Sequence, residues 1–310
     1  VYKRQRGACE VITVRIHFDP LGDFERYELP PRANLTKGGH RPFSPADHKK
    51  LHEILSDPYS QLKSIGWDEI TVPQVAFARN PRVDAISGAT ALSKRDVVVV
   101  GAAYTCYTLW HWSHGEVVNA IHEMTISATD ERDLVNYLES GEGKFAIFAA
   151  DQLRQREIFD NKTVAEVRDV MRHGDERVVD SALRYLAAAS AKTGVDHFLR
   201  CCQDKHLIAS SVKRTRFLEA LRDSTEHLPS GCLDQLGRWL ATADTYYEVH
   251  LLLTLLEREE TASHEALDGA LLQLNNQNFR VVDKCYQFLK DKELSKTQLR
   301  KLQAFENRTP

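Results

Sequence analysis

The chain has 310 residues, of which 42% are hydrophobic and 27% are charged, and its formal net charge at pH 7 is -3. This length suggests two domains, and the composition is that of a globular protein with enough apolar residues for packed cores. The small negative charge gives no electrostatic reason to expect nucleic acid or an anionic membrane as a partner. No apolar run in the sequence approaches the roughly 20 residues that a membrane-spanning helix needs.

The sequence begins with Val1 rather than Met, so we expect a fragment or a processed form. Any signal peptide or membrane anchor would precede it. The cysteines show no CxxC pair and no zinc-type spacing. Although their even number permits disulfides, we interpret them as buried small hydrophobic residues. They are Cys9, Cys106, Cys201, Cys202, Cys232 and Cys285.

The first elements of the chain predict a β-hairpin. Residues 10–19 (EVITVRIHFD) alternate and are rich in β-branched residues, which is typical of a strand. Residues 19–23 (DPLGD) supply proline and glycine for a turn, and residues 24–29 (FERYEL) read as the return strand.

A helix is predicted next, with clear start and stop signals. Ser44 is a good N-cap, Pro45 occupies the first helical position, and Asp47 lies where a capping box has its acid. The pair Asp57-Pro58 ends the helix. Its apolar face consists of Leu51, Ile54 and Leu55.

Residues 67–72 (WDEITV) and 74–79 (QVAFAR) indicate two further short strands that lead into a segment of small residues, 83–94 (VDAISGATALSK). The β-branched run 97–100 (VVVV) favours a strand by propensity. We nevertheless expect a helix there, because of the family resemblance given below. This half of the chain is predicted to be α+β.

After about residue 130 the strand patterns end, and amphipathic helices of roughly 10 to 16 residues follow one another across short polar turns. Helix pairs start near Thr163, Val195, Cys232 and His264, a period of roughly 30 to 40 residues. That period is typical of an α-solenoid, in which one pair cannot bury its apolar face alone. The pattern resembles HEAT-like repeats, and an irregular helical domain is the alternative.

An internal sequence similarity supports the interpretation of this half as a repeat domain. Residues 177–186 (RVVDSALRYL) and 280–289 (RVVDKCYQFL) share Arg-Val-Val-Asp, an aromatic residue and a leucine at the same offsets. Residues 245–256 (TYYEVHLLLTLL) fit the same pattern more loosely.

The segment Ser87-Gly88-Ala89-Thr90 places a threonine hydroxyl behind residues with little side-chain bulk, and Asp84 lies just upstream. A helix is expected to follow, and the N-terminus of a helix favours phosphate. Taken alone, these residues favour an ordinary loop of small residues over a site.

This segment resembles the signature of the FMN-binding domain family, which includes the flavin-carrying subunits of the sodium-pumping quinone reductase and of the Rnf complex. In that family the motif runs Asp-Gly/Ala-x-Ser/Thr-Gly-Ala-Thr. The last threonine is esterified to the phosphate of FMN by a flavin transferase that uses FAD and a divalent metal. Asp84, Ser87, Gly88, Ala89 and Thr90 match position by position, so the resemblance implies covalent FMN on Thr90.

The chemistry of that modification suits the residues present. A transferase must bring the hydroxyl of Thr90 in line with a phosphorus atom, and Gly88 and Ala89 keep the approach open. The resemblance covers about residues 10–125. It departs from the family at Leu92, where members often have threonine.

Aromatic residues that could bear the flavin ring follow in residues 103–112 (AYTCYTLWHW). In a helix, Tyr104 and Tyr107 would lie along one side, with Trp110 as a further candidate. Tyr104 is the preferred flavin neighbour. The alternative is that these aromatic residues form part of the core.

Two other polar clusters are interpreted as structural. His111, His114 and His122 lack the carboxylate or cysteine that would complete a convincing metal site, so we interpret them as solvent-facing or capping residues. Residues 211–216 (SVKRTR) are interpreted as the solvated face of a helix.

The sequence therefore predicts an α+β FMN-binding domain over residues 1–125, shortened by one or two strands at its N-terminus. An all-α, HEAT-like repeat domain would follow over residues 126–310. The resemblance implies a periplasmic or otherwise extracytoplasmic electron carrier, with redox proteins as partners and a flavin transferase for maturation. No nucleophile–base pair or Gly-rich nucleotide loop is evident, so we do not expect the chain to turn over a substrate alone.

A second hypothesis is a helical-repeat binding protein whose N-terminal domain has lost its cofactor. Leu92, the shortened start and the length of the helical half favour it. Non-covalent flavin binding with reductase activity is a third hypothesis. The sequence shows no substrate site that would support it.

Overall fold

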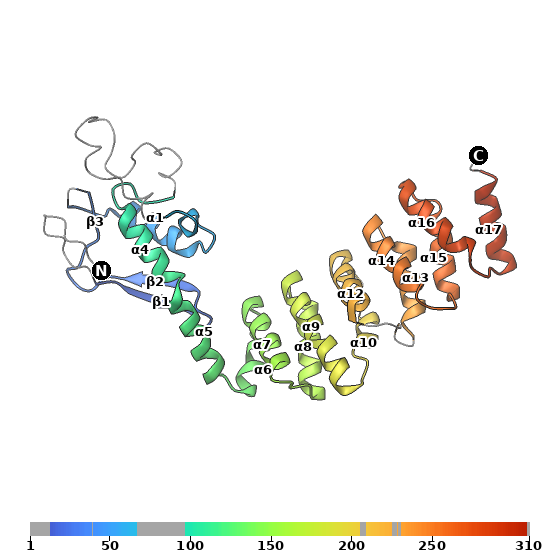
Figure 1. Cartoon of the computed structure of the whole chain (residues 1–310), viewed down its shortest axis with the longest axis horizontal. Coiled ribbons are helices and arrows are strands. Elements are labelled where there is room, and N and C mark those ends of the chain that lie inside the picture. The colour runs from blue at the N-terminus through green and yellow to red at the C-terminus, as the bar shows by residue number, and fades with distance from the viewer. Residues whose placement is uncertain are drawn as a thin grey trace. The chain divides into compact units, whose positions relative to one another are not determined.

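The computed structural model describes residues 13–38, 40–66, 97–204, 209–224, 228 and 231–308 (Figure 1). These residues are mostly helical, with two short β-hairpins near the N-terminus. The chain divides into two compact units, residues 1–129 and residues 130–310. The boundary expected after residue 125 falls inside helix α5 (Glu116–Ala128), which belongs to unit 1.

The first hairpin of unit 1 pairs β1 (Arg15–Phe18) with β2 (Phe24–Glu28) in antiparallel register, as the sequence predicts. The turn is closed by the carboxylate of Asp19, which accepts hydrogen bonds from the backbone N–H groups of Leu21 (2.8 Å) and Asp23 (3.0 Å). The strand is shorter than expected, because residues 13 and 14 precede it without strand structure. A second hairpin joins β3 (Thr36–Lys37) to β4 (Arg41–Pro42).

Helix α1 (Pro45–Ser56) confirms the predicted capping box. The hydroxyl of Ser44 accepts from the backbone N–H of Asp47, and the Asp47 carboxylate accepts from the backbone N–H of Ser44 at 2.8 Å. Two N–H groups that the helix itself leaves without partners are thereby satisfied. The 3-10 helix η1 (Gln61–Lys63) follows. The predicted apolar face packs into the core of unit 1, which includes Leu35, Leu51, Ile54, Leu55, Leu62, Val99, Cys106 and Trp110.

The prediction of a helix over residues 97–100 is wrong. Val97–Val100 form a turn, and α4 (Ala103–Ser113) begins only after it. Gly101 has φ +89°, a left-handed conformation that interrupts a right-handed helix. Burial of Val98 and Val99 in the core holds the turn in place. The predicted strands over residues 67–72 and 74–79 lie outside the described residues.

Unit 2 is a succession of helix pairs (Figure 1). The first helices of the pairs start at residues 131, 161, 198, 232 and 264, and a further helix starts at residue 296, a spacing of 30 to 37 residues. The starts expected near Thr163, Val195, Cys232 and His264 lie within three residues of four of these. The first helices of the five pairs are α6 (Glu131–Glu139), α8 (Asn161–His173), α10 (Phe198–Cys202), α13 (Cys232–Thr242) and α15 (His264–Gln273). Helix α17 (Lys296–Glu306) occupies the next first position, and no second helix follows it among the described residues.

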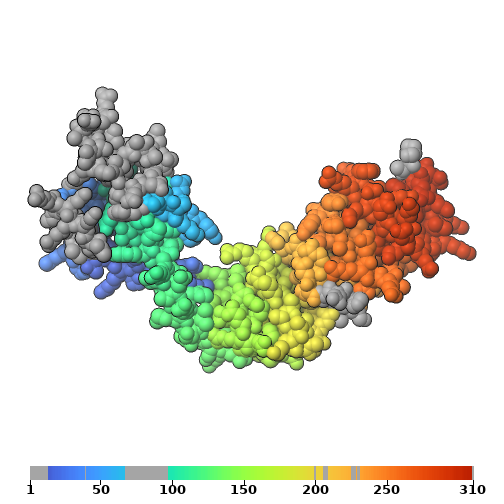
Figure 2. Space-filling model, viewed as in Figure 1, coloured from blue at the N-terminus to red at the C-terminus, as the bar shows by residue number. Residues whose placement is uncertain are grey.

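The second helices of the pairs form a continuous row, in which each contacts the next. Among the first helices, α6 contacts α8, and α13 contacts both α10 and α15. Helix α15 in turn contacts α17. The colours of Figure 2 accordingly run in chain order through unit 2, from green to red. All three segments that share the repeated sequence pattern lie in second helices, so the pattern corresponds to the second helix of a pair. The second helices are α7 (Gly143–Gln155), α9 (Glu176–Thr193), α12 (Ser211–Ser224), α14 (Tyr246–Leu256) and α16 (Phe279–Lys290).

Candidate functional site

All of the flavin-site residues predicted from the motif lie outside the described residues. They are Asp84, Ser87, Gly88, Ala89 and Thr90. Tyr104 is described: it lies in the first turn of α4 and is 50% exposed. Its side chain therefore lies at the surface of the described part of unit 1.

The other aromatic residues of α4 do not form one bed with Tyr104. Trp110 is 3% exposed, and its indole N–H donates to the carbonyl oxygen of Asp57 at 2.9 Å. This ring therefore belongs to the core and is not available to a flavin, in agreement with the core alternative. Tyr107 packs against the same core, whereas Trp112 is 54% exposed.

The histidines of this region pack on aromatic rings. The ring of His111 lies 4.1 Å from that of Tyr107, and the ring of His114 stacks on Trp110 at 4.6 Å. Nδ1 of His114 lies 3.0 Å from the carbonyl oxygen of Trp110, at the C-terminal end of α4. Burial lowers the pKa of His114. The described residues contain no group of three or more His, Cys, Asp or Glu side chains arranged to hold a metal ion.

A polar network crosses the second helices of unit 2 and is centred on α12. Nε of Arg214 lies 2.6 Å from Oε1 of Glu248 in α14, and Glu248 is fully buried. The second carboxylate oxygen of Glu248 accepts from the hydroxyl of Ser211 at 3.3 Å. The buried charge is thus compensated by an ion pair and a further hydrogen bond, which burial of a carboxylate requires.

The same helix reaches the preceding pair through Lys213. Its ammonium donates to the carbonyl oxygens of Met171 at 2.7 Å and Arg172 at 2.9 Å. These carbonyls belong to the last turn of α8, where the helix leaves them without backbone partners and where a cation is favoured. Burial lowers the pKa of Lys213.

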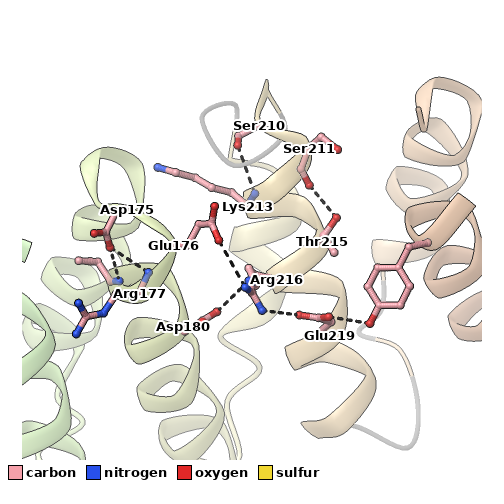
Figure 3. Close-up of polar contacts among 12 residues, drawn as sticks. Asp175, Glu176, Arg177, Asp180, Ser210, Ser211, Lys213, Thr215, Arg216 and Glu219 are labelled. Carbon is pink, nitrogen blue, oxygen red and sulfur yellow. Dashed lines mark hydrogen bonds and ion pairs between the residues drawn. The ribbon is translucent and has the colours of Figure 1, made fainter. Parts of the chain in front are cut away.

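Arg216 extends the network across the surface of α9 and α12 (Figure 3). Its guanidinium lies 3.5 Å from Glu176, 3.7 Å from Asp180 and 3.4 Å from Glu219. Glu219 in turn accepts from the hydroxyl of Tyr247 in α14 at 2.7 Å. The carboxylates around Arg216 hold its pKa above the usual value, Asp180 contributing most.

The prediction that residues 211–216 form a solvated helix face is therefore wrong for Arg214 and incomplete for its neighbours. Arg214 is 7% exposed because it faces α14, where Glu248 neutralises it. Only the spacing of Lys213, Arg214 and Arg216 was visible in the sequence. Nothing in the sequence near them identified Glu248, 34 residues later, as the partner.

The interpretation of the cysteines as buried small hydrophobic residues is corrected at two positions, and Cys9 lies outside the described residues. Cys202 and Cys232 form a disulfide. The thiols of Cys106, Cys201 and Cys285 are buried and unpaired, as expected. Burial raises the pKa of Cys106 to about 11 and the pKa of Cys201 and Cys285 to about 12. A raised pKa favours the protonated thiol, which is a poor nucleophile.

Comparison with known proteins gives no relative: no family model, curated protein or solved structure matches this chain. No helix within the described part of the chain is long and apolar enough to cross a membrane. The arrangement in unit 2 is a set of mutually compensated charges at helix contacts. Such a set is suited to holding helices in register and presenting polar groups.

Proposed function

We propose that the chain is an electron-transfer flavoprotein that carries FMN through a phosphoester on Thr90. The observation that carries the proposal is the match of Asp84, Ser87, Gly88, Ala89 and Thr90 to the FMN-binding signature. Support comes from Tyr104, a half-exposed aromatic side chain in the first turn of the helix that follows the motif. A flavin ring stacked on such a side chain gains roughly 0.5 to 1.5 kcal/mol beyond the burial of its area.

A covalent tether suits an electron carrier. A flavin held with merely micromolar affinity, about -8 kcal/mol, would dissociate where free flavin is scarce. A phosphoester removes that equilibrium. An FMN held on Thr90 would supply reversible electron-transfer chemistry between partner proteins.

The helical unit would serve as the docking part of this carrier. Paired helices with a period of 30 to 37 residues resemble HEAT-like repeats. Stacked repeats of this kind present extended surfaces on which partner proteins bind. We infer that redox partners dock on unit 2.

An extracytoplasmic location follows from the resemblance, and the disulfide between Cys202 and Cys232 supports it. Disulfides form and persist mainly in oxidising compartments. A flavin transferase in the same compartment would be required for maturation.

The direct test is co-expression of the chain with a flavin transferase, followed by denaturing electrophoresis. The wild-type band is expected to keep its flavin fluorescence, because the ester survives denaturation. Thr90→Ala should remove the fluorescence, and Thr108→Ala, a half-buried hydroxyl in α4, should keep it. A dark wild-type band would contradict covalent attachment, and colour lost only on denaturation would indicate non-covalent flavin.

A second candidate is a cofactor-free helical-repeat binding protein. It is favoured by the polar network that joins α9, α12 and α14, in which Tyr247 remains 44% exposed. Aromatic and arginine side chains at a surface are typical of protein-binding sites. Under this alternative the purified chain would acquire no flavin from the transferase. In a pull-down experiment, unit 2 alone would retain the same binding partners as the full chain.

A further inference from the structure

The disulfide of unit 2 joins two different helix pairs. Cys202 is the last residue of α10, and Cys232 is the first residue of α13. These are the first helices of consecutive pairs, and the two cysteines are 30 residues apart in the chain. Both are fully buried. The bond therefore holds two consecutive repeats together, at a contact between α10 and α13 that is called the joint below. It does not close a surface loop.

Helix α10 needs such support. It has only five residues, and its N-cap residue, His197, makes no side-chain capping hydrogen bond. A helix of this length is unstable by itself, because the cost of nucleation is not offset by propagation. Every other first helix of the array has nine residues or more.

Aromatic packing supplies the rest of the joint. The ring of Phe198 in α10 lies 5.9 Å from that of Phe217 in α12, and Phe217 lies 5.8 Å from Trp239 in α13. All three side chains are at most 2% exposed. Helix α10 is thus held in place by these consecutive aromatic contacts and by the disulfide to Cys232.

The adjacent Cys201 cannot replace Cys202 in this bond. Successive residues of an α-helix point about 100° apart. Cys201 lines a small cavity with Arg168 and Met171 of α8, and its thiol lies 3.7 Å from the carbonyl oxygen of His197. The geometry directs Cys201 toward the preceding pair and Cys202 toward the following one.

We propose that the Cys202–Cys232 disulfide forms while the chain folds in a disulfide-forming compartment and thereafter holds α10 against α13. The oxidant is a protein disulfide-exchange catalyst. One cysteine thiolate attacks the disulfide of the catalyst and forms a mixed disulfide, releasing one catalyst thiolate. The other cysteine thiolate then attacks the mixed disulfide, which forms the Cys202–Cys232 bond and leaves the catalyst as a dithiol that has taken up two electrons and two protons.

Burial fixes when this exchange takes place. Neither sulfur is accessible in the folded unit, so the bond must form before the joint closes and is afterwards protected from small reductants. A chain folded under reducing conditions keeps the aromatic contacts but lacks the bond, and its α10 is expected to open more often than the rest of the array.

The test uses the full-length wild-type chain, refolded once with a glutathione redox couple and once with excess dithiothreitol, followed by hydrogen exchange and mass spectrometry. The reduced form is expected to exchange about 100-fold faster in residues 198–204, with exchange in α15 and α16 unchanged. Cys202→Ala should reproduce this increase under oxidising conditions. Cys285→Ala, which removes a buried unpaired thiol from α16, should not.

Peptide mapping of the oxidised wild-type chain gives an independent readout that needs no variant. After alkylation under denaturing conditions, a cross-linked peptide pair should contain Cys202 and Cys232, and Cys201 should be alkylated. Alkylation of both Cys202 and Cys232, a cross-link through Cys201, or equal exchange in the two redox forms would overturn the proposal.

Discussion

Arg214 and Glu248 form a buried ion pair between α12 and α14, with 2.6 Å between Nε and Oε1. The pair joins second helices of consecutive repeats at a place where neither charge is solvated. Its contribution depends on both members being present, since a buried charge that loses its partner is strongly destabilising.

Replacing Arg214 alone should therefore be costly. We expect Arg214→Met to lower the free energy of unfolding of unit 2 by about 3 to 5 kcal/mol, because Glu248 is left buried without its cation. The double variant Arg214→Met with Glu248→Leu should recover most of the loss. Denaturant unfolding of the single and double variants measures both effects.

Arg216→Met provides the matched control on the same helix. Its side chain is 40% exposed, so the loss of its ion pairs should cost less than about 1 kcal/mol. Equal effects of the Arg214 and Arg216 substitutions would contradict the distinction between a buried pair and a surface network.

A close backbone contact between α13 and α15 makes a second prediction. A Cβ atom added at Gly269 would lie 2.4 Å from the carbonyl oxygen of Gly237, which no side-chain movement can relieve. Gly269→Ala should therefore separate the helices and lower the free energy of unfolding by about 1 to 3 kcal/mol. Gly143→Ala is the control, because its Cβ would meet only a Val178 methyl group at 3.2 Å. A Gly269→Ala variant as stable as this control would refute the contact.

Acid should weaken unit 1 through Asp47. Hydrogen bonds from Lys37 and from Ser44 hold the pKa of this carboxyl at about 2, below its usual value of 3.8. The folded state therefore binds the proton less tightly than the unfolded state does, and the resulting stabilisation is fully present above about pH 4 and lost as the pH falls toward 2. NMR titration of the Asp47 carboxyl in the wild type and in Lys37→Met checks this. The substitution should raise the pKa, and an unchanged pKa would show that Lys37 has no influence.

Tyr104 allows a test of the proposed flavin position that is separate from stability. Because the side chain is half exposed, Tyr104→Leu should change the melting temperature little, yet it should increase flavin fluorescence if the ring stacks on the isoalloxazine. Trp112→Leu, at a similarly exposed position of the same helix, should leave the fluorescence unchanged. The reverse pattern would place the flavin beside Trp112 instead.

Local signals in the sequence were sufficient for several elements. The capping box of Ser44 and Asp47 acts within one helical turn, so the start of α1 could be predicted. The period of the helix pairs was visible because each pair must present a similar apolar face to its neighbours.

Features that depend on distant partners could not be predicted in this way. The burial of Arg214 depends on Glu248, and the pairing of Cys202 depends on Cys232. The helix predicted over the valine run before α4 rested on the family resemblance, and residues 97–100 form a turn instead. That turn ends at Gly101, whose left-handed conformation is one that glycine permits without requiring it, so the residue type alone does not predict it. The motif that carries the family resemblance lies in residues 84–90, outside the described residues, so its test is chemical.

The intact mass of the chain after co-expression with a flavin transferase tests the central claim most directly. We predict an increase equal to one FMN minus one water, located by fragmentation on the peptide that contains Thr90 and absent from Thr90→Ala. A wild-type chain of unmodified mass, recovered beside a control protein that the same transferase has flavinylated, would contradict the account.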